Sequence, residues 1–483
     1  MTPQNSFFLF LVALCFTYTA TAVAQTAGAG RGTSLAGLTL TNAVKMALSS
    51  VGNHEVRIAE ESVNMARAKT DAARSVFLPQ IMGSADYSRQ LVNNAALGLT
   101  PQNGISLLPD TSTSDNYDAR ISLRANIAFD SIKRWKASDA GTDAAILELE
   151  RVKDRIAVRT AELYLICVRN EQFVKAASNT LKMANSYLRW VTPRGRTVDI
   201  LGAKADRAAD NDNLLSAQND LALSRLKLLK ALGRGLDEIN KLTLNAAKDI
   251  SDPVIAAYLD NYLDEEAGEF TEEQVQKYNN AVNVHSKNTT NMKTTLETGE
   301  RSRSDLKALE ERKRQADTLH SSNMLEQWPA LVLYGDYGPN GTNSKDLVNT
   351  YTLGGGLRLP LFAGGRMAAQ KRRSVAEIER TRAQYYDLKA QVQLEIREAG
   401  ETIDSASRRL AAANESLYFS WKEFNERNKS NVLNTNNLIE RDQAKTKLSQ
   451  AKFRGVDALF NYYRALINLW YAQGTIQEKL GVQ

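Results

Sequence analysis

The sequence predicts a mixed α/β membrane protein in which four β-strands and long antiparallel coiled-coil helices occur in an internal twofold repeat. In the segment from Tyr117 to Phe129 every odd position is apolar and most even positions are polar or charged. A period of two places these sets on opposite faces of a strand. A tilted strand crosses a bilayer in about 9–11 residues, so this one can separate lipid from water. A strand of a soluble sandwich alternates similarly, and two long proline-free stretches and a recurring order of motifs decide against it.

The N-terminus is predicted to be a signal peptide of residues 1–24. An apolar run from Phe7 to Phe16 precedes small residues around Val23, which indicates cleavage before Gln25. Residues 25–37 are expected to form a flexible segment. No later apolar run approaches the roughly 20 residues of a membrane-spanning helix.

Cysteine content and charge exclude two classes of interaction. Cys15 lies in the predicted signal, so Cys167 is the only thiol of the mature chain and no intrachain disulfide is possible. The net charge of +6 is spread along the chain, so we expect no nucleic-acid partner. Packing or assembly must therefore stabilise this exported protein of 483 residues.

The first structural repeat is expected at residues 38–233, with strands at about 80–91 and 117–129. Phe77-Leu78-Pro79 ends an alanine-rich helical pattern and opens the first strand. A long helix is expected at about 131–191, because residues 134–190 contain one glycine and no proline and would span about 85 Å as one helix. A return helix is expected at about 199–232.

The second repeat is expected at residues 299–483, with strands at about 331–338 and 351–362, a long helix at about 365–430 and a return helix at about 438–474. Trp328-Pro329-Ala330 opens its first strand. Apolar residues recur at steps of three and four from Tyr385 to Phe424, which is the heptad pattern of a coiled coil. Between the repeats, residues 234–298 form a connecting region whose polar runs indicate a solvated surface.

Strand parity assigns side chains to the two faces of the sheet. The polar positions expected to face water inside a barrel are Asp86, Arg120, Arg124 and Arg358. Aromatic residues at the two ends of the strands are typical of the interfacial girdles of an outer-membrane barrel. Those toward the loop ends are Tyr87, Tyr117, Tyr337 and Tyr351, and those toward the opposite ends are Phe77, Phe129, Trp328 and Phe362.

Four strands cannot form a closed barrel alone. An open sheet in lipid leaves edge amides unpaired, at a cost of several kcal/mol each. Single-chain bacterial barrels begin at about eight strands, so at least two chains are required, and three would supply twelve strands. Composition does not separate two, three or four copies.

No catalytic or metal-binding constellation is evident. His54, His285 and His320 are isolated, with no cysteine or carboxylate at metal-ligand spacing. Gly354-Gly355-Gly356 lies inside a predicted strand, so it is interpreted as easing strand curvature rather than as a phosphate loop. We therefore expect no enzymatic activity and no cofactor.

Four segments carry a resemblance to a known family. They are Leu38–Val44 with Ala47-Leu48, Ala73–Pro79, Arg303–Ala308, and Gly356–Arg366, which reads GLRLPLFAGGR. In this order and spacing the chain resembles the TolC-like outer-membrane efflux channel family over nearly everything after the signal. The resemblance implies a homotrimer that shares a twelve-stranded outer-membrane barrel, a helical α-barrel that crosses the periplasm, and a mixed equatorial region.

The resemblance also implies a function and partners. The chain would be the passive exit duct of a tripartite system, and a periplasmic adaptor (membrane fusion) protein would connect it to an inner-membrane RND or ABC transporter. Type I protein secretion uses the same architecture and is an alternative. A non-conducting trimeric coiled-coil scaffold or adhesin is an alternative of another class.

In this family the helical hairpin tips form the periplasmic gate and the adaptor-docking surface. The first tip resembles the family at residues 195–201, which include Asp199. The second tip, residues 430–440, reads SNVLNTNNLIE and lacks the usual Gly-Thr pair. Asn437 and Glu440 match the acidic pore ring, so one of two carboxylates is lost. Three copies of Glu440 would favour cations, or Glu440 would instead stabilise the start of the last helix.

Overall fold

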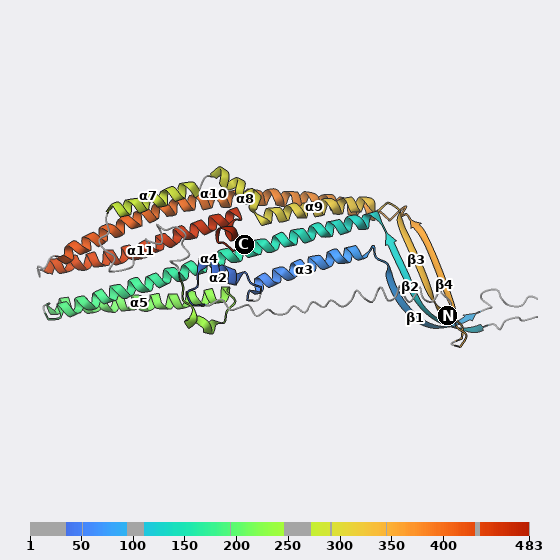
Figure 1. Cartoon of the computed structure of the whole chain (residues 1–483), viewed down its shortest axis with the longest axis horizontal. Helices are drawn as coiled ribbons and strands as arrows, with labels where there is room; N and C mark the ends of the chain where they lie inside the picture. Colours follow the sequence, from blue (N-terminus) through green and yellow to red (C-terminus); the bar gives the residue numbers. More distant parts are fainter. Residues whose placement is uncertain are drawn as a thin grey trace, which may run out of the picture.

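The computed structural model describes residues 35–50, 52–93, 111–193, 195–245, 272–289, 292–343, 345–429 and 435–482. The molecule is elongated (Figure 1): helices run along its length, a β-sheet lies at one end, and two helical hairpin tips lie at the other. Among the described residues, no helix combines the length and apolar character needed to span a membrane.

Two long helices run nearly the whole length of the helical part. Helix α4 (Phe129–Val191) has 63 residues and α10 (Arg366–Lys429) has 64, which corresponds to about 95 Å each. Two shorter helices pack against the part of α4 nearer the sheet: α3 (His54–Ser75) and α9 (Ser304–Leu325). The middle of the molecule, where these helices begin, is called the equator below.

Two return helices complete the hairpins on the tip side of the equator. They are α5 (Thr197–Ala231), which packs against α4, and α11 (Thr435–Gln473), which packs against α10 and α4. Each half of the chain therefore contains helix, two strands, long helix and return helix in the same order, which confirms the predicted repeat.

The sheet has four antiparallel strands in the order β1-β2-β3-β4. Their bounds are β1 (Gln80–Asn93), β2 (Thr111–Ile127), β3 (Ala330–Gly341) and β4 (Val348–Arg358). Strands β2 and β3 come from different halves and pair with each other, so the sheet joins the two repeats. Strands β1 and β4 are its two edges.

The bounds of β2 and β4 differ most from those expected. Strand β2 begins at Thr111 instead of about 117, because its polar first residues pair with β1 although they lack apolar alternation; Asn93 lies opposite Thr111. It ends at Ile127, so Phe129 begins α4 rather than ending the strand. Strand β4 ends at Arg358, because Pro360 has no N–H to continue the ladder.

The connection from β4 to α10 therefore contains Phe362, which the sequence had suggested as part of the strand. Gly364 and Gly365 follow with φ of 58° and 81°, a left-handed conformation that makes the turn into the helix.

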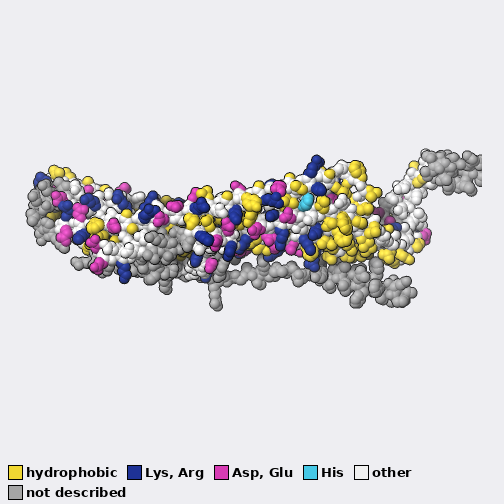
Figure 2. All heavy atoms as spheres, turned by 90° about the horizontal axis from the view of Figure 1, so that it is seen from above, with side chains coloured by type: hydrophobic (Ala, Val, Ile, Leu, Met, Phe, Trp, Pro, Cys, Tyr) yellow, Lys and Arg dark blue, Asp and Glu magenta, His cyan; other side chains and the backbone are white. Residues whose placement is uncertain are grey.

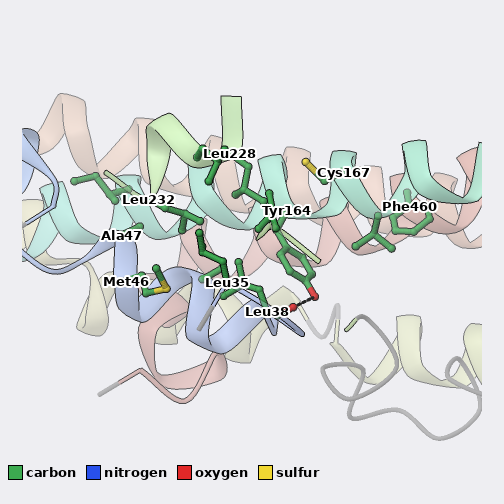
Figure 3. Close-up of a cluster of buried hydrophobic side chains, with 14 of the residues drawn as sticks. Leu35, Leu38, Met46, Ala47, Tyr164, Cys167, Leu228, Leu232 and Phe460 are labelled. Atoms are coloured by element: carbon green, nitrogen blue, oxygen red, sulfur yellow. Dashed lines mark hydrogen bonds between the residues drawn. The ribbon is translucent and has the colours of Figure 1, made fainter. Parts of the chain in front are cut away.

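The equator contains a compact apolar core. Figure 3 shows side chains from the N-terminal segment and from α2 (Leu40–Ala47), α4, α5 and α11 meeting there. Tyr164 is 1% exposed and its hydroxyl donates a hydrogen bond to the carbonyl of Leu38 at 3.0 Å. Leu35, which belongs to the segment 25–37 expected to be flexible, is also buried in this core, whereas Ala36 and Gly37 are exposed. Residues 1–34 lie outside the described part of the chain.

The connecting region adds three short helical elements at the equator and beside α10. They are η1 (Leu236–Lys241), α7 (Glu272–Thr289) and α8 (Met292–Ser302). Helix α7 packs along α10, and α8 packs against α10 and α11. The sequence did not predict the packing of α7, because most of its residues are polar. Its apolar residues Val275 and Val282 are nevertheless buried. The last helix, α12 (Ile476–Lys479), closes onto α11 and α4.

A buried arginine connects four helices where α8 gives way to α9. Arg303 is 1% exposed and donates to Asp305 at 2.9 and 2.7 Å, to Glu395 of α10 at 2.6 Å, and to the carbonyl of Ala472 at 3.2 Å. Arg151 of α4 also contacts Asp305 at 3.2 Å. Burial alone would raise the pKa of Asp305, but the guanidinium groups of Arg303 and Arg151 outweigh it and lower that pKa. The paired charges position α4, α9, α10 and α11 relative to one another.

The predicted coiled-coil seam is the buried face of α10. Val392, Ile396, Ile403 and Leu410 are each 0% exposed and pack against α11. Small residues of the facing helix α11, among them Ala465, are buried as well.

Replacing Ile403 with alanine tests this seam. The substitution leaves a cavity between α10 and α11, and we expect it to lower the free energy of unfolding by about 3 kcal/mol. Guanidinium denaturation of the detergent-solubilised protein measures the change. Arg397→Ala, at an exposed position of the same helix, is the control and should change stability by less than about 0.5 kcal/mol. Equal effects of the two substitutions would contradict the seam.

Candidate functional site

The strand register places the four predicted water-facing residues on one face of the sheet. Residues directly opposite in an antiparallel pair point to the same face. Asp86 lies opposite Asp118, Arg120 opposite Ser84, and Arg124 opposite Gln80 and Tyr334. Arg358, at the end of β4, shares this parity. The structure thus brings Asp86, Arg120, Arg124 and Arg358 onto one polar face.

Charged partners cross the strands on this face. Arg120 donates to Asp118 at 2.6 Å and to Asp336 of β3 at 2.8 Å. The bridge links the two repeats across the β2–β3 junction. Asp336 was not among the predicted residues, although its parity, opposite to that of Leu333 and Tyr337, was a usable signal.

The other face of the sheet is apolar and exposed. Figure 2 shows hydrophobic side chains gathered over the strands and the adjoining helix ends, whereas charged side chains cover the helices. Tyr351 and Leu353 of β4 are 79% and 86% exposed. An apolar surface of this extent is characteristic of a protein or lipid contact.

Two tyrosine pairs lie on the apolar face. Tyr87 lies opposite Tyr117 with ring centroids 4.8 Å apart, and Tyr337 lies opposite Tyr351. Because β1 and β2 are longer than expected, Tyr87 and Tyr117 lie in the middle of their hairpin rather than toward its loop. The other pair does lie toward the loop end of β3 and β4.

The second set of aromatics gathers where the strands meet the helices. Phe129 packs edge-on against Trp328 at 6.0 Å, and Phe77 packs edge-on against Trp135 at 6.4 Å. Phe362 is 88% exposed. Trp135 extends this set and was not predicted, because its neighbours read as helix rather than strand.

The first hairpin tip is stabilised by a capping carboxylate. Asp199, in the first turn of α5, accepts hydrogen bonds from the backbone N–H of Arg196 at 3.1 Å and from its Nε at 3.1 Å. These bonds favour the charged form and lower the pKa of Asp199. The predicted tip residue therefore satisfies a free N–H at the helix start.

Helices α10 and α11 reach the second tip at the same end of the molecule as the first tip (Figure 1), and residues 430–434 of that tip lie outside the described residues. Glu440 pairs with Arg427 across the hairpin from α11 to α10. Glu440 is the sixth residue of α11, so it does not cap the helix start. Asn437 lies in α11, but its side chain is outside the described part of the structure.

Two further contacts join the hairpins near the tips. Lys445 of α11 donates to Asp210 of α5 at 3.0 Å, with side-chain exposures of 12% and 16%. The guanidinium of Arg441 lies 5.8 Å from the ring centroids of both Tyr187 and Trp190 on α4. The sequence shows which residues are charged but not which of them meet when they are far apart in the chain, so neither contact was predicted.

Histidine and cysteine side chains elsewhere in the described structure do not form a reactive or metal-binding site. In the described residues no group of three or more histidine, cysteine or acidic side chains could hold a metal ion. His320 Nδ1 lies 2.8 Å from the hydroxyl of Ser374, and the His285 side chain is not described. Burial raises the pKa of Cys167 to about 11, so the thiol is not poised to react. The ring of Tyr334 fills the space above Gly354, where a Cβ would lie 2.4 Å from the ring. Position 354 therefore requires a glycine because the Tyr334 ring occupies the space of a side chain, in addition to any effect of glycine on strand curvature.

Comparisons with known proteins agree with this architecture. Residues 46–234 match the family described as outer membrane efflux protein. No curated protein sequence matches the chain. The CmeC outer membrane channel of Campylobacter jejuni is 16% identical, with a TM-score of 0.68 over 90% of this chain and 86% of that chain.

Two further solved structures are similar in extent. The outer membrane protein VceC of Vibrio cholerae is 16% identical, with a TM-score of 0.67 over 90% of this chain and 96% of that chain. The open state of the MtrE outer membrane channel of Neisseria gonorrhoeae is 15% identical, with a TM-score of 0.65 over 90% and 89%. These likenesses confirm the predicted fold class. The family match over residues 46–234 confirms the predicted resemblance.

Replacing Asp199 with asparagine tests the capping carboxylate. At pH 7 we expect faster amide hydrogen exchange in the first turn of α5, because the charged acceptor is lost. In the unmodified protein this protection depends on the ionised carboxylate. It is complete above the ordinary aspartate pKa and is lost as the pH falls through the lowered pKa of Asp199.

The control is Asp212→Asn, an exposed position further along α5. It should leave exchange in the first turn unchanged. Exchange that is independent of both the substitution and the pH would contradict the capping role.

Proposed function

We propose that this chain, a member of the outer membrane efflux protein family by its residues 46–234, forms the exit duct of a tripartite efflux or export system. It would passively conduct substrates from a periplasmic adaptor and an inner-membrane pump to the exterior. The single observation that carries the proposal is the four-stranded sheet, which has one apolar exposed face, one polar charged face and two open edges.

The open edges require further copies of the chain. In lipid the free N–H and C=O groups of β1 and β4 would remain unpaired, at a cost of several kcal/mol each. Pairing β4 of one copy with β1 of the next removes both edges. The proposed homotrimer closes twelve strands, and the apolar face would then contact outer-membrane lipid.

The register suits such a closed barrel. Tyr337 lies opposite Ile121, so the pair formed by Tyr337 and Tyr351 is displaced by four residues from Tyr117 (121 − 117) along the strands. Barrel strands tilt by about 35–45° with a fixed stagger between neighbours. In a tilted barrel this displacement brings the two tyrosine pairs to a similar height, as expected for one girdle.

The helical hairpins would provide the periplasmic part of the duct. Packed side by side in three copies, α4, α5, α10 and α11 would form an α-barrel, and their tips would contact the adaptor. Glu440, Asp199 and Asn437 are proposed to lie at the tip constriction. Because Glu440 pairs with Arg427 within one chain, its charge is partly compensated there. An RND or ABC transporter would supply the energy.

Trimer formation and conductance test the function together. The mature protein should enter the outer-membrane fraction, run as a heat-resistant trimer on a denaturing gel, and conduct ions in planar bilayers. A water-soluble monomer would overturn the proposal. Trimers in the membrane that never conduct would instead favour the non-conducting scaffold or adhesin.

Two neighbouring substitutions test the assignment of the two faces. Ile121→Asp places a charge on the proposed lipid face, at a cost of about 1–2 kcal/mol in each copy, so we expect much less protein in the membrane fraction. Arg120→Leu removes the bridge to Asp118 and Asp336 on the proposed lumen face. It should preserve insertion and alter conductance or trimer stability. Equal tolerance of both changes in membrane-fraction and conductance assays would refute the assignment.

A further inference from the structure

The charges on the polar face are distributed unevenly along the strands. Asp86 and Asp118 lie opposite each other near the middle of the β1–β2 hairpin. Arg124 lies six residues beyond Asp118 toward the helices (124 − 118), which is about 20 Å along the strand. Arg358 is the last residue of β4, next to the helices.

The two helix-side arginines have no acidic partner on the described strands. Arg124 lies opposite the neutral residues Gln80 and Tyr334, and Arg358 lies opposite Ala330. Both side chains are exposed. In contrast, Arg120 is held by two carboxylates. The helix end of the polar face is therefore positive without local compensation.

The two arginines occupy equivalent positions in the two repeats. Arg124 follows Tyr117 by seven residues (124 − 117), and Arg358 follows Tyr351 by seven (358 − 351). Each tyrosine lies opposite another tyrosine on the first strand of its own hairpin. The stagger that brings the tyrosine pairs to one height in a tilted barrel therefore brings Arg124 and Arg358 to one height as well.

We propose that Arg124 and Arg358 form an anion-binding ring of six guanidinium groups where the β-barrel lumen meets the helices, and that this ring selects small anions carrying carboxylate or phosphate groups. The inference rests on the proposed trimeric channel and adds the substrate class to it. Rings of arginine or lysine characterise anion and phosphate pores. Guanidinium groups also bind carboxylate and phosphate through paired hydrogen bonds.

The side chains around the ring leave it accessible. Gly356 lies on the same face of β4, and a Cβ there would meet nothing within 4 Å. The Tyr334 ring lies over Gly354 and gives the face beside Arg124 an aromatic surface. Since the Debye length at physiological salt is about 8 Å, the ring acts on ions within the lumen near it and little on the distant tips.

The test is ion selectivity of the trimer in planar bilayers. A potassium chloride gradient gives the reversal potential, and inorganic pyrophosphate added on the helix side gives a concentration for half-block of the current. The double variant Arg124→Gln, Arg358→Gln should shift the reversal potential toward cation selectivity and raise the half-blocking concentration at least tenfold. The double lysine variant keeps the charge and should retain the reversal potential of the unmodified channel.

Arg89→Gln is the matched control. Arg89 lies on the apolar parity of β1, is exposed, and pairs with Asp115 at 3.4 Å, so its removal should change neither measurement. If the double glutamine variant fails to form heat-resistant trimers, Arg358→Gln alone serves, with a smaller shift in the same direction.

The outcomes separate this inference from the proposed function. A channel that conducts, but whose selectivity and pyrophosphate block are unchanged by the glutamine substitutions, overturns the ring and leaves the duct intact. An unmodified protein that forms trimers without current overturns the duct, and the ring with it. A shift equal to that of Arg89→Gln would also overturn the ring.

Discussion

The requirement that every backbone N–H and C=O find a partner governs this structure more than any single contact. The sheet pairs two hairpins from different halves of the chain and still leaves β1 and β4 as edges. Among the described residues of one copy, no element covers its apolar face. Both features are unfavourable for an isolated protein in water, and both are resolved in the proposed barrel. In the proposed barrel the chain is thus one part of a larger closed surface.

The helical part must keep the long helices α4, α5, α10 and α11 in a fixed register along most of the molecule. Apolar seams stabilise the α10–α11 pair, but such seams tolerate sliding by whole heptads. The buried Arg303 node contacts α9, α10 and α11 at defined atoms, and Arg151 joins α4 to it. Directional, charge-assisted hydrogen bonds of this kind fix position more strictly than apolar packing does.

Much of the architecture could be predicted because its signals are local and periodic. Alternation identified the strands, heptads identified α10, and the absence of proline gave the long helices nearly to the residue. The first residues of β2 were missed because they pair through their backbone without apolar alternation. Asp336, Lys445 and Arg441 were missed because their partners lie far away in sequence, and no local pattern reports such pairs. Leu35 was assigned to a flexible segment because its apolar contacts are with residues far away in sequence.

The pairing of β2 with β3 has a further meaning. It joins the second strand of one repeat to the first strand of the other, and the pairing of β4 with a neighbouring β1 would do the same between chains. The building block of the proposed cylinder is therefore a single hairpin, used six times with pseudo-sixfold symmetry. Covalent linkage of two blocks leaves three seams between chains instead of six, which lowers the number of separate encounters needed before the wall is complete.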